Sequence, residues 1–187
     1  MVHCATERQA HEVRAALEQR LAGVGLRLHP DKTKIVYCKD RKRRGRYPNT
    51  SFTFLGFTFQ ARAAPTRDKR SMFTSFLPAM SRQKQKAKSK VVRRWRLHRK
   101  TTSDLADLAE WMNPVIQGWM NYYGMFYKSE LYGLLRRINT YLVRWARRKY
   151  KRLRAFKRFK RWWDRLLKRA PNLFAHWKWM PHFVWTR

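Results

Sequence analysis

The stretch SELYGLLRRINTYLVRWARRK, residues 129–149, decides the architecture of the second half of the chain. Apolar side chains recur in it at intervals of three and four residues, at Leu131, Leu134, Leu135, Ile138, Leu142 and Trp145. An α-helix repeats about every 3.6 residues, so this spacing places them on one side of a helix. The sequence therefore predicts an amphipathic helix over residues 129–149 that buries one face.

Further helices are predicted on both sides of this stretch. A basic helix is expected over residues 81–97, and Thr102-Ser103 is expected to cap the next one. Asn113-Pro114 resembles a fresh helix start, with an N-cap residue followed by a first-turn proline. A basic and aromatic helix is expected over residues 151–169, with an irregular tail after it. The chain from residue 81 onward is therefore predicted to be helical.

The first part of the chain has a different pattern. Thr6 and Gln9 have the spacing of a capping box, and apolar residues at helical intervals predict a helix over residues 7–22. Residues 26–28 and 35–37 are expected to form short strands around a turn. This part is therefore predicted to be small and rich in strands.

The clearest strand pattern is FTFLGFTF, residues 52–59. Phenylalanine and threonine alternate on both sides of Leu55-Gly56, where the alternation shifts its phase. A glycine at such a shift is typical of a bulge or of a close backbone approach. Residues 60–80 are expected to form a loop, and the change in composition near Ser81 is expected to be a domain boundary.

Composition and charge indicate a polyanionic partner. The 187 residues contain 45 Lys and Arg against 11 Asp and Glu, which gives a formal net charge of +34. A compact domain with this self-repulsion is hard to maintain unless a polyanion neutralises it. Nine Trp and eight Tyr accompany the charge, and aromatic side chains among arginines suit RNA, whose unpaired bases stack on both. RNA is therefore favoured over duplex DNA.

No complete active site or metal site is predicted. Asp104, Asp107 and Glu110 are the one acidic cluster, and carboxylates in the first turns of a helix are favoured by its dipole. Cys4 and Cys38 are too few for a disulfide framework, and their spacing matches no familiar zinc pattern. No run of about 18 apolar residues is present. The expectation is a cytoplasmic protein without a catalytic residue, metal ligand or membrane segment of its own.

Three segments, in order, resemble group II intron reverse transcriptases/maturases. Residues 25–36, GLRLHPDKTKIV, resemble the segment that follows the catalytic hairpin of those enzymes. Residues 52–59 resemble the motif at their palm-to-thumb junction, and residues 113–123, NPVIQGWMNYY, resemble the signature of their maturase-specific region. Phe174-Ala175-His176-Trp177 is similar to the close of the bacterial members. The similarity runs over almost the whole chain.

The resemblance implies an α+β fold in two parts. Residues 1–80 would be a partial, β-rich reverse-transcriptase palm remnant, and residues 81–187 an all-helical maturase-specific domain, also called the thumb or X domain. The family's Tyr-Ala-Asp-Asp motif would stand before Val2, so the catalytic aspartates and their Mg²⁺ are not expected in this chain. Three alternatives stay open: an RNA-binding maturase fragment that assists splicing, one half of a split or truncated RNA-directed DNA polymerase, and a non-functional mobile-element remnant.

The expected partner is structured RNA, in particular group II intron RNA, with a separate polypeptide supplying the polymerase fingers and palm under the second alternative. Sixteen Lys and Arg against the single acid Asp164 lie between Arg136 and Arg169. Such one-sided charge is more typical of a phosphate-binding surface than of a merely solvated helix face. The predicted RNA-binding residues are Lys32, Lys34, Lys84, Lys86, Lys88, Lys90, Arg93, Arg94, Arg96, Tyr122, Arg136, Arg137, Arg144, Arg147, Arg148, Lys151 and Arg152.

Overall fold

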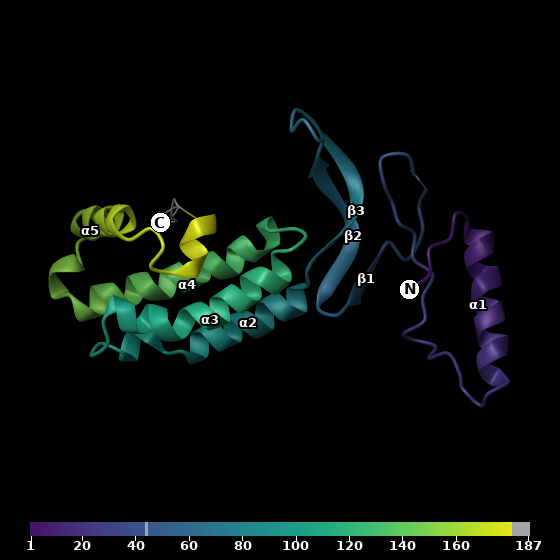
Figure 1. The fold of residues 1–187 in the computed structure, drawn as a ribbon, viewed down its shortest axis with the longest axis horizontal. Helices are drawn as coiled ribbons and strands as arrows, with labels where there is room; N and C mark the ends of the chain where they lie inside the picture. The colour runs from purple at the N-terminus through teal and green to yellow at the C-terminus, as the bar shows by residue number, and fades with distance from the viewer. Residues whose placement is uncertain (44, 181–187) are drawn as a thin grey trace. The chain divides into compact units, whose positions relative to one another are not determined.

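The computed structural model describes residues 1–43 and 45–180 (Figure 1). Contacts divide the chain into two compact units. Unit 1 comprises Met1–Phe52 and Phe59–Leu77, and unit 2 comprises Thr53–Thr58 and the chain from Pro78 onward. The main division therefore lies just before the boundary predicted at residue 81, and the short segment Thr53–Thr58 belongs with the helices. Helices and a small sheet together make the predicted α+β class correct.

Unit 1 begins with α1, Glu7–Ala22, as predicted. Thr6 caps it by accepting a hydrogen bond from the Gln9 backbone N–H, while the Gln9 side chain accepts from Ala5 rather than from Thr6. None of the residues of α1 is buried. The amphipathic pattern thus produced a helix whose apolar side stays largely accessible.

The strands predicted at residues 26–28 and 35–37 are absent, and this prediction is wrong. The backbone there is irregular, and its backbone hydrogen bonds are local or isolated: Leu26 N–H donates to Leu21 and Tyr37 N–H to Asn49. A strand needs a neighbouring ladder to satisfy its backbone groups, and alternation within one segment cannot supply that neighbour.

A three-stranded sheet follows, with β1, Ser51–Phe54, β2, Phe57–Pro65, and β3, Met72–Met80, in that order. Short connections join neighbouring strands, so the sheet is antiparallel. Leu55 and Gly56 form the turn between β1 and β2 with φ of 48° and 86°, as in a type I′ turn. The predicted bulge is therefore a hairpin turn. The loop predicted over residues 60–80 is also wrong, because Thr66–Ser71 alone connects β2 to β3.

In unit 2, α2 spans Arg82–Arg94 and the short helix η1 spans Leu97–Arg99. The helix α3, Leu105–Tyr123, begins at Asp104 and not at the predicted Thr102-Ser103 cap. The Asp104 carboxylate accepts from the Asp107 N–H at 2.9 Å, and the Asp107 carboxylate accepts from the Asp104 N–H at 2.8 Å. This reciprocal capping box confirms the structural interpretation of these acids.

The fresh start predicted at Asn113-Pro114 is wrong, because α3 continues through Pro114 without a break. Proline costs a helix one backbone hydrogen bond, but its ring here lies on the exposed side. On the opposite side the buried stripe runs past it unbroken, at Leu108, Met112, Ile116, Trp119, Met120 and Tyr123. Burial of that stripe outweighs the local cost of the proline, and an argument from helix propensity alone does not include this burial.

The predicted central helix is confirmed as α4, Ser129–Lys149, and its six stripe residues are all buried. It packs against α2 and η1 (Figure 1). The last predicted helix is divided into η2, Lys151–Leu153, and α5, Phe156–Arg169. The short helix η3, Ala175–Trp179, packs against α3. The tail predicted to be irregular therefore contains a helical turn, and residues 181–187 lie outside the described part of the chain.

Side-chain amides hold this C-terminal segment on the bundle. Asn113 donates from Nδ2 to the Leu173 carbonyl and accepts from the Ala175 N–H, both at 2.9 Å. Gly124 leaves the space that Trp179 occupies, since a β-carbon at that position would clash with the indole. The segment therefore docks by fixed polar contacts as well as by burial of Phe174 and Trp177.

A buried polar triad completes the docking. Asn139 Oδ1 accepts the Trp177 indole N–H at 3.0 Å and lies 2.7 Å from His176 Nε2. Indole is only a donor, so this oxygen is the acceptor for both groups and Nε2 carries the imidazole proton. Burial lowers the pKa of His176 to about 3, and the ring is neutral at pH 7.

Replacing Asn113 by Ala should lower the free energy of unfolding by about 1–3 kcal/mol, because the Leu173 carbonyl and the Ala175 N–H lose their partner. Urea unfolding followed by circular dichroism measures this change. The control is Asn121→Ala on the same helix, where the side chain contacts Gln117 at the surface. Equal effects of the two substitutions would contradict the docking role of Asn113.

Acid should destabilise the fold through His176. The unfolded side chain takes up a proton near pH 6.5, whereas the folded one does so only near pH 3. Stability from this residue is complete above pH 6.5 and falls by about 1.4 kcal/mol per pH unit below it. Urea unfolding at pH 7 and pH 5 should therefore show a smaller loss in His176→Leu than in the unchanged protein. The same loss in both proteins would refute the assignment, and His98→Leu at half-buried η1 is the control.

Candidate nucleic-acid interface

The outer face of α4 carries the densest group of predicted residues. The positions of Arg136, Arg137, Arg144, Arg147 and Arg148 fall on one side of the helix, opposite the buried stripe. All five are exposed, whereas Leu135, Ile138 and Leu142 are fully buried. Burial of the apolar stripe therefore fixes the direction in which these guanidinium groups point.

Two cations near the end of α4 have structural contacts. Arg147 donates to the Arg154 carbonyl, which ties the end of α4 to the segment after η2. Lys149 donates to the Ser103 carbonyl and lies over the Trp145 ring at 5.4 Å. Arg148, by contrast, is exposed on the outer face with Arg144. The predicted role of Arg147 in RNA binding is thus shared with a role in the fold.

The second predicted group lies on α2 and is divided between two faces. Lys86, Lys90, Arg93 and Arg94 are exposed on the outer side. Lys88 is half-buried, with its ammonium 5.4 Å from the centroid of Trp119. Lys84 packs its alkyl chain beside Gly56, and Arg96 lies past the helix end with φ of 48°. Six of these seven cations are therefore exposed, and Lys88 is the half-buried one, with the Trp119 ring beneath its ammonium group.

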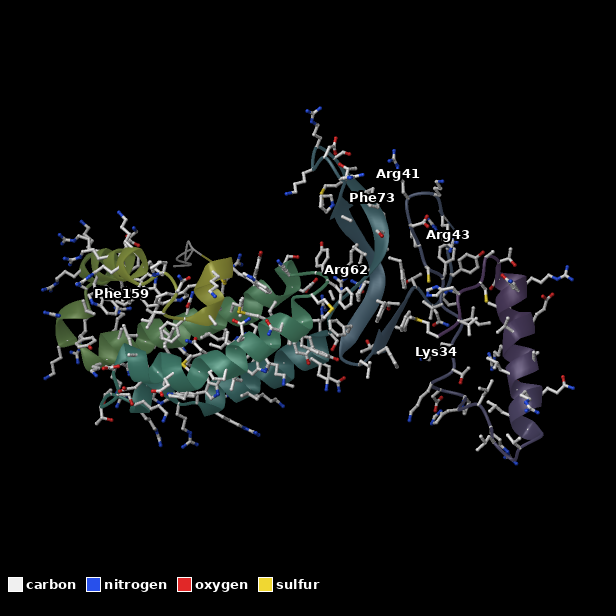
Figure 2. The ribbon with its side chains drawn as sticks, viewed as in Figure 1. Lys34, Arg41, Arg43, Arg62, Phe73 and Phe159 are labelled. Atoms are coloured by element: carbon white, nitrogen blue, oxygen red, sulfur yellow. The ribbon has the colours of Figure 1, made fainter. Side chains whose placement is uncertain are left out.

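The remaining predicted residues are scattered. Tyr122 is 45% exposed and donates its hydroxyl to the Leu55 carbonyl at 2.8 Å, so its position is fixed by the hairpin turn. Lys151 and Arg152 are exposed on η2, continuing the basic surface of α4. Lys32 and Lys34 are exposed in unit 1, and Lys34 is labelled in Figure 2. The structure thus groups the residues of unit 2 on α4, η2 and α2, and leaves these two lysines in the other unit.

A third basic surface, on α5, is absent from the predicted set. Phe159 and Trp163 are buried one turn apart and fix the inner side of this helix; Figure 2 labels Phe159. The exposed residues are then almost all cationic: Lys157, Arg158, Lys160, Arg161, Arg165, Lys168 and Arg169. Lys160 pairs with Asp164 at 2.7 Å. The apolar pair four residues apart was the sequence signal that could have identified this face.

The outer face of α4 also contains a shallow hollow that the sequence did not suggest. It has a volume of about 340 Å³ and is lined by Gly133, Arg136, Arg137, Thr140, Tyr141 and Arg144. The three arginines belong to the predicted set, whereas Gly133, Thr140 and Tyr141 do not. A glycine at an exposed position of a long helix was the available signal.

Over residues 1–43 and 45–180, no three His, Cys, Asp or Glu side chains converge as metal ligands would. No helix in those ranges has the length and apolar character needed to cross a membrane. The charged surfaces of unit 2 are thus arginine and lysine faces, and the acids Asp104 and Asp107 are engaged in the cap of α3.

Comparison with known protein families finds a match for part of the chain. Residues 84–163 match the family model of the group II intron maturase-specific domain. No curated protein and no solved structure matches the chain significantly. The matched residues contain most of α2, all of α3 and α4, and the first part of α5. The basic outer face of α4 therefore lies within the segment that is similar to the group II intron maturase-specific domain.

Proposed function

We propose that this protein is a maturase-type factor that binds structured group II intron RNA and assists its splicing. The observation that carries the proposal is the outer face of α4. Its exposed arginines lie together there, inside the segment that matches the maturase-specific domain. The intron RNA supplies the splicing chemistry, and the protein stabilises the folded RNA by binding it.

Phosphate contacts explain how such a face acts. Guanidinium groups form two parallel hydrogen bonds to a phosphate, which positions the backbone without reading the base sequence. Each contact also releases counterions condensed on the RNA, so affinity falls as salt rises. Neutralising this charge would also relieve the repulsion among the side chains of α4 and α5. Binding and stability of unit 2 are then coupled.

The assignment of residues 1–80 to a polymerase palm is part of the same proposal. The Phe54-Leu55-Gly56-Phe57 hairpin supports it, because its turn requires positive φ at two residues and the family resemblance falls on that motif. Under this proposal a separate polypeptide carrying fingers and palm would restore RNA-directed DNA synthesis. Mixing the two chains and assaying primer extension tests this, and no extension by the mixture would count against it.

Removing two outer arginines should weaken intron binding without unfolding the protein. In the variant Arg144→Gln with Arg148→Gln, both lost charges come from the exposed face of α4. If each contacts one phosphate, the slope of log K against log salt should shrink by roughly 1.4–1.8 in total. Filter binding of a group II intron RNA at several salt concentrations measures both affinity and slope.

The matched control carries the same change of net charge on α1, with Arg14→Gln and Arg20→Gln, both exposed in unit 1. Its slope should remain close to that of the unchanged protein. Equal slopes in all three proteins, or equal losses in both variants, would mean that RNA binding does not depend on the face of α4.

A further inference from the structure

The shallow hollow on α4 is unusual because a glycine forms part of its lining. A β-carbon at Gly133 would meet no atom within 4 Å, so neither packing nor a neighbouring side chain requires glycine there. Glycine within a helix costs about 1 kcal/mol relative to alanine. Gly133 thus lowers the stability of the helix, and no packing contact requires a glycine there. It leaves the helix backbone accessible between the arginines.

The lining residues define what this hollow can bind. Arg136, Arg137 and Arg144 supply guanidinium donors, and no carboxylate lines the hollow. The Thr140 hydroxyl donates to the Arg136 carbonyl at 3.0 Å, so its proton is already engaged. A set of charged donors without an acid suits an anion and disfavours a cation. The Glu130 carboxylate is not among the lining residues, and it accepts a hydrogen bond from Gln85 Nε2 at 3.3 Å.

The aromatic residue of the hollow does not present an open face for base stacking. The Arg144 guanidinium lies over the Tyr141 ring, 5.6 Å from its centroid. Tyr141 therefore holds Arg144 in place, and the anion that the hollow accepts is recognised through guanidinium groups. A phosphate has the matching charge and the paired oxygen acceptors.

We propose that this hollow binds a phosphate at a point where the RNA backbone leaves the regular duplex, as in a bulge or loop. The proposal rests on the RNA-binding function inferred above and specifies its ligand. A regular duplex can contact the exposed arginines of α4 outside the hollow. A shallow recess lined by three arginine residues adds most for a phosphate that projects from the backbone. Bulges and loops are where proteins recognise structured RNA.

Filling the hollow without changing its charge tests this directly. Gly133→Leu places an apolar side chain between the arginines, in space that is empty and in a helix that favours leucine. The matched control is Gly118→Leu on α3, where a β-carbon also meets nothing within 4 Å. The helix α3 contains no Lys or Arg, so that substitution changes no basic surface.

The measurement compares affinity for a bulged RNA hairpin with affinity for the same hairpin fully paired, using the full chain at fixed salt. We expect Gly133→Leu to lose about tenfold on the bulged hairpin, as for one charged hydrogen-bonded contact, and to keep its affinity for the paired one. Gly118→Leu should keep both affinities. Circular dichroism confirms that both variants are folded. Arg137→Lys keeps the positive charge but cannot form two parallel hydrogen bonds to a phosphate, so it should also lose affinity for the bulged hairpin and keep its affinity for the paired one.

The outcomes separate this proposal from the proposed function. A protein that binds both hairpins equally, or a Gly133→Leu variant that behaves like Gly118→Leu, overturns the hollow as a phosphate site while RNA binding stands. Equal losses on both hairpins likewise overturn the preference for a projecting phosphate. Failure of the unchanged protein to bind either hairpin, or intron RNA, at low salt refutes the proposed function itself.

Discussion

The two opposite faces of α4 are the constraint on which unit 2 depends. One face buries seven apolar side chains, and the other presents arginines with no carboxylate between them. Because one helix carries both faces, burying the apolar side fixes the direction of the charged side. Burial of large apolar side chains contributes roughly 1.5–3 kcal/mol each, which offsets the repulsion among exposed, screened charges. Apolar burial within the fold therefore stabilises a surface whose like charges repel one another.

The C-terminal segment stabilises the same arrangement from the other side of the bundle. Asn113 and Asn139 each bind it with one amide, from α3 and α4 respectively. The NPVIQGWMNYY stretch thus has a structural role in this chain, since Asn113 holds residues 173–175. Gly124 serves the same docking by accommodating Trp179. Parts of the maturase-like signature are therefore needed to fix the bundle that presents the basic face.

The sequence predicted the helices of unit 2 well because their apolar stripes are long and regular. It failed at Asn113-Pro114, where a helix start was predicted, because α3 continues through Pro114. The segments at residues 26–28 and 35–37 failed because strand pairing is not a local property. Residues 60–80 were predicted to form a loop, although Pro65 and Pro78 both lie within strands of a small sheet.

The candidate interface was predictable in charge but not in shape. The one-sided composition identified α4 and α2 as basic, whereas the inward position of Lys88, the carbonyl contact of Arg147 and the hollow at Gly133 required coordinates. The cations of α5 belong to the Lys and Arg counted between Arg136 and Arg169. Only the burial of Phe159 and Trp163 shows that they lie together on one face of the helix.

The central claim is that intron RNA lies on the outer face of α4. The most direct measurement is modification of arginines by a guanidine-specific dicarbonyl reagent, with and without intron RNA, followed by peptide mass spectrometry. The account predicts that RNA protects Arg136, Arg137, Arg144 and Arg148, while Arg14 and Arg20 on α1 remain as reactive as in the free protein. Protection spread evenly over exposed arginines, or absent from α4, would contradict it.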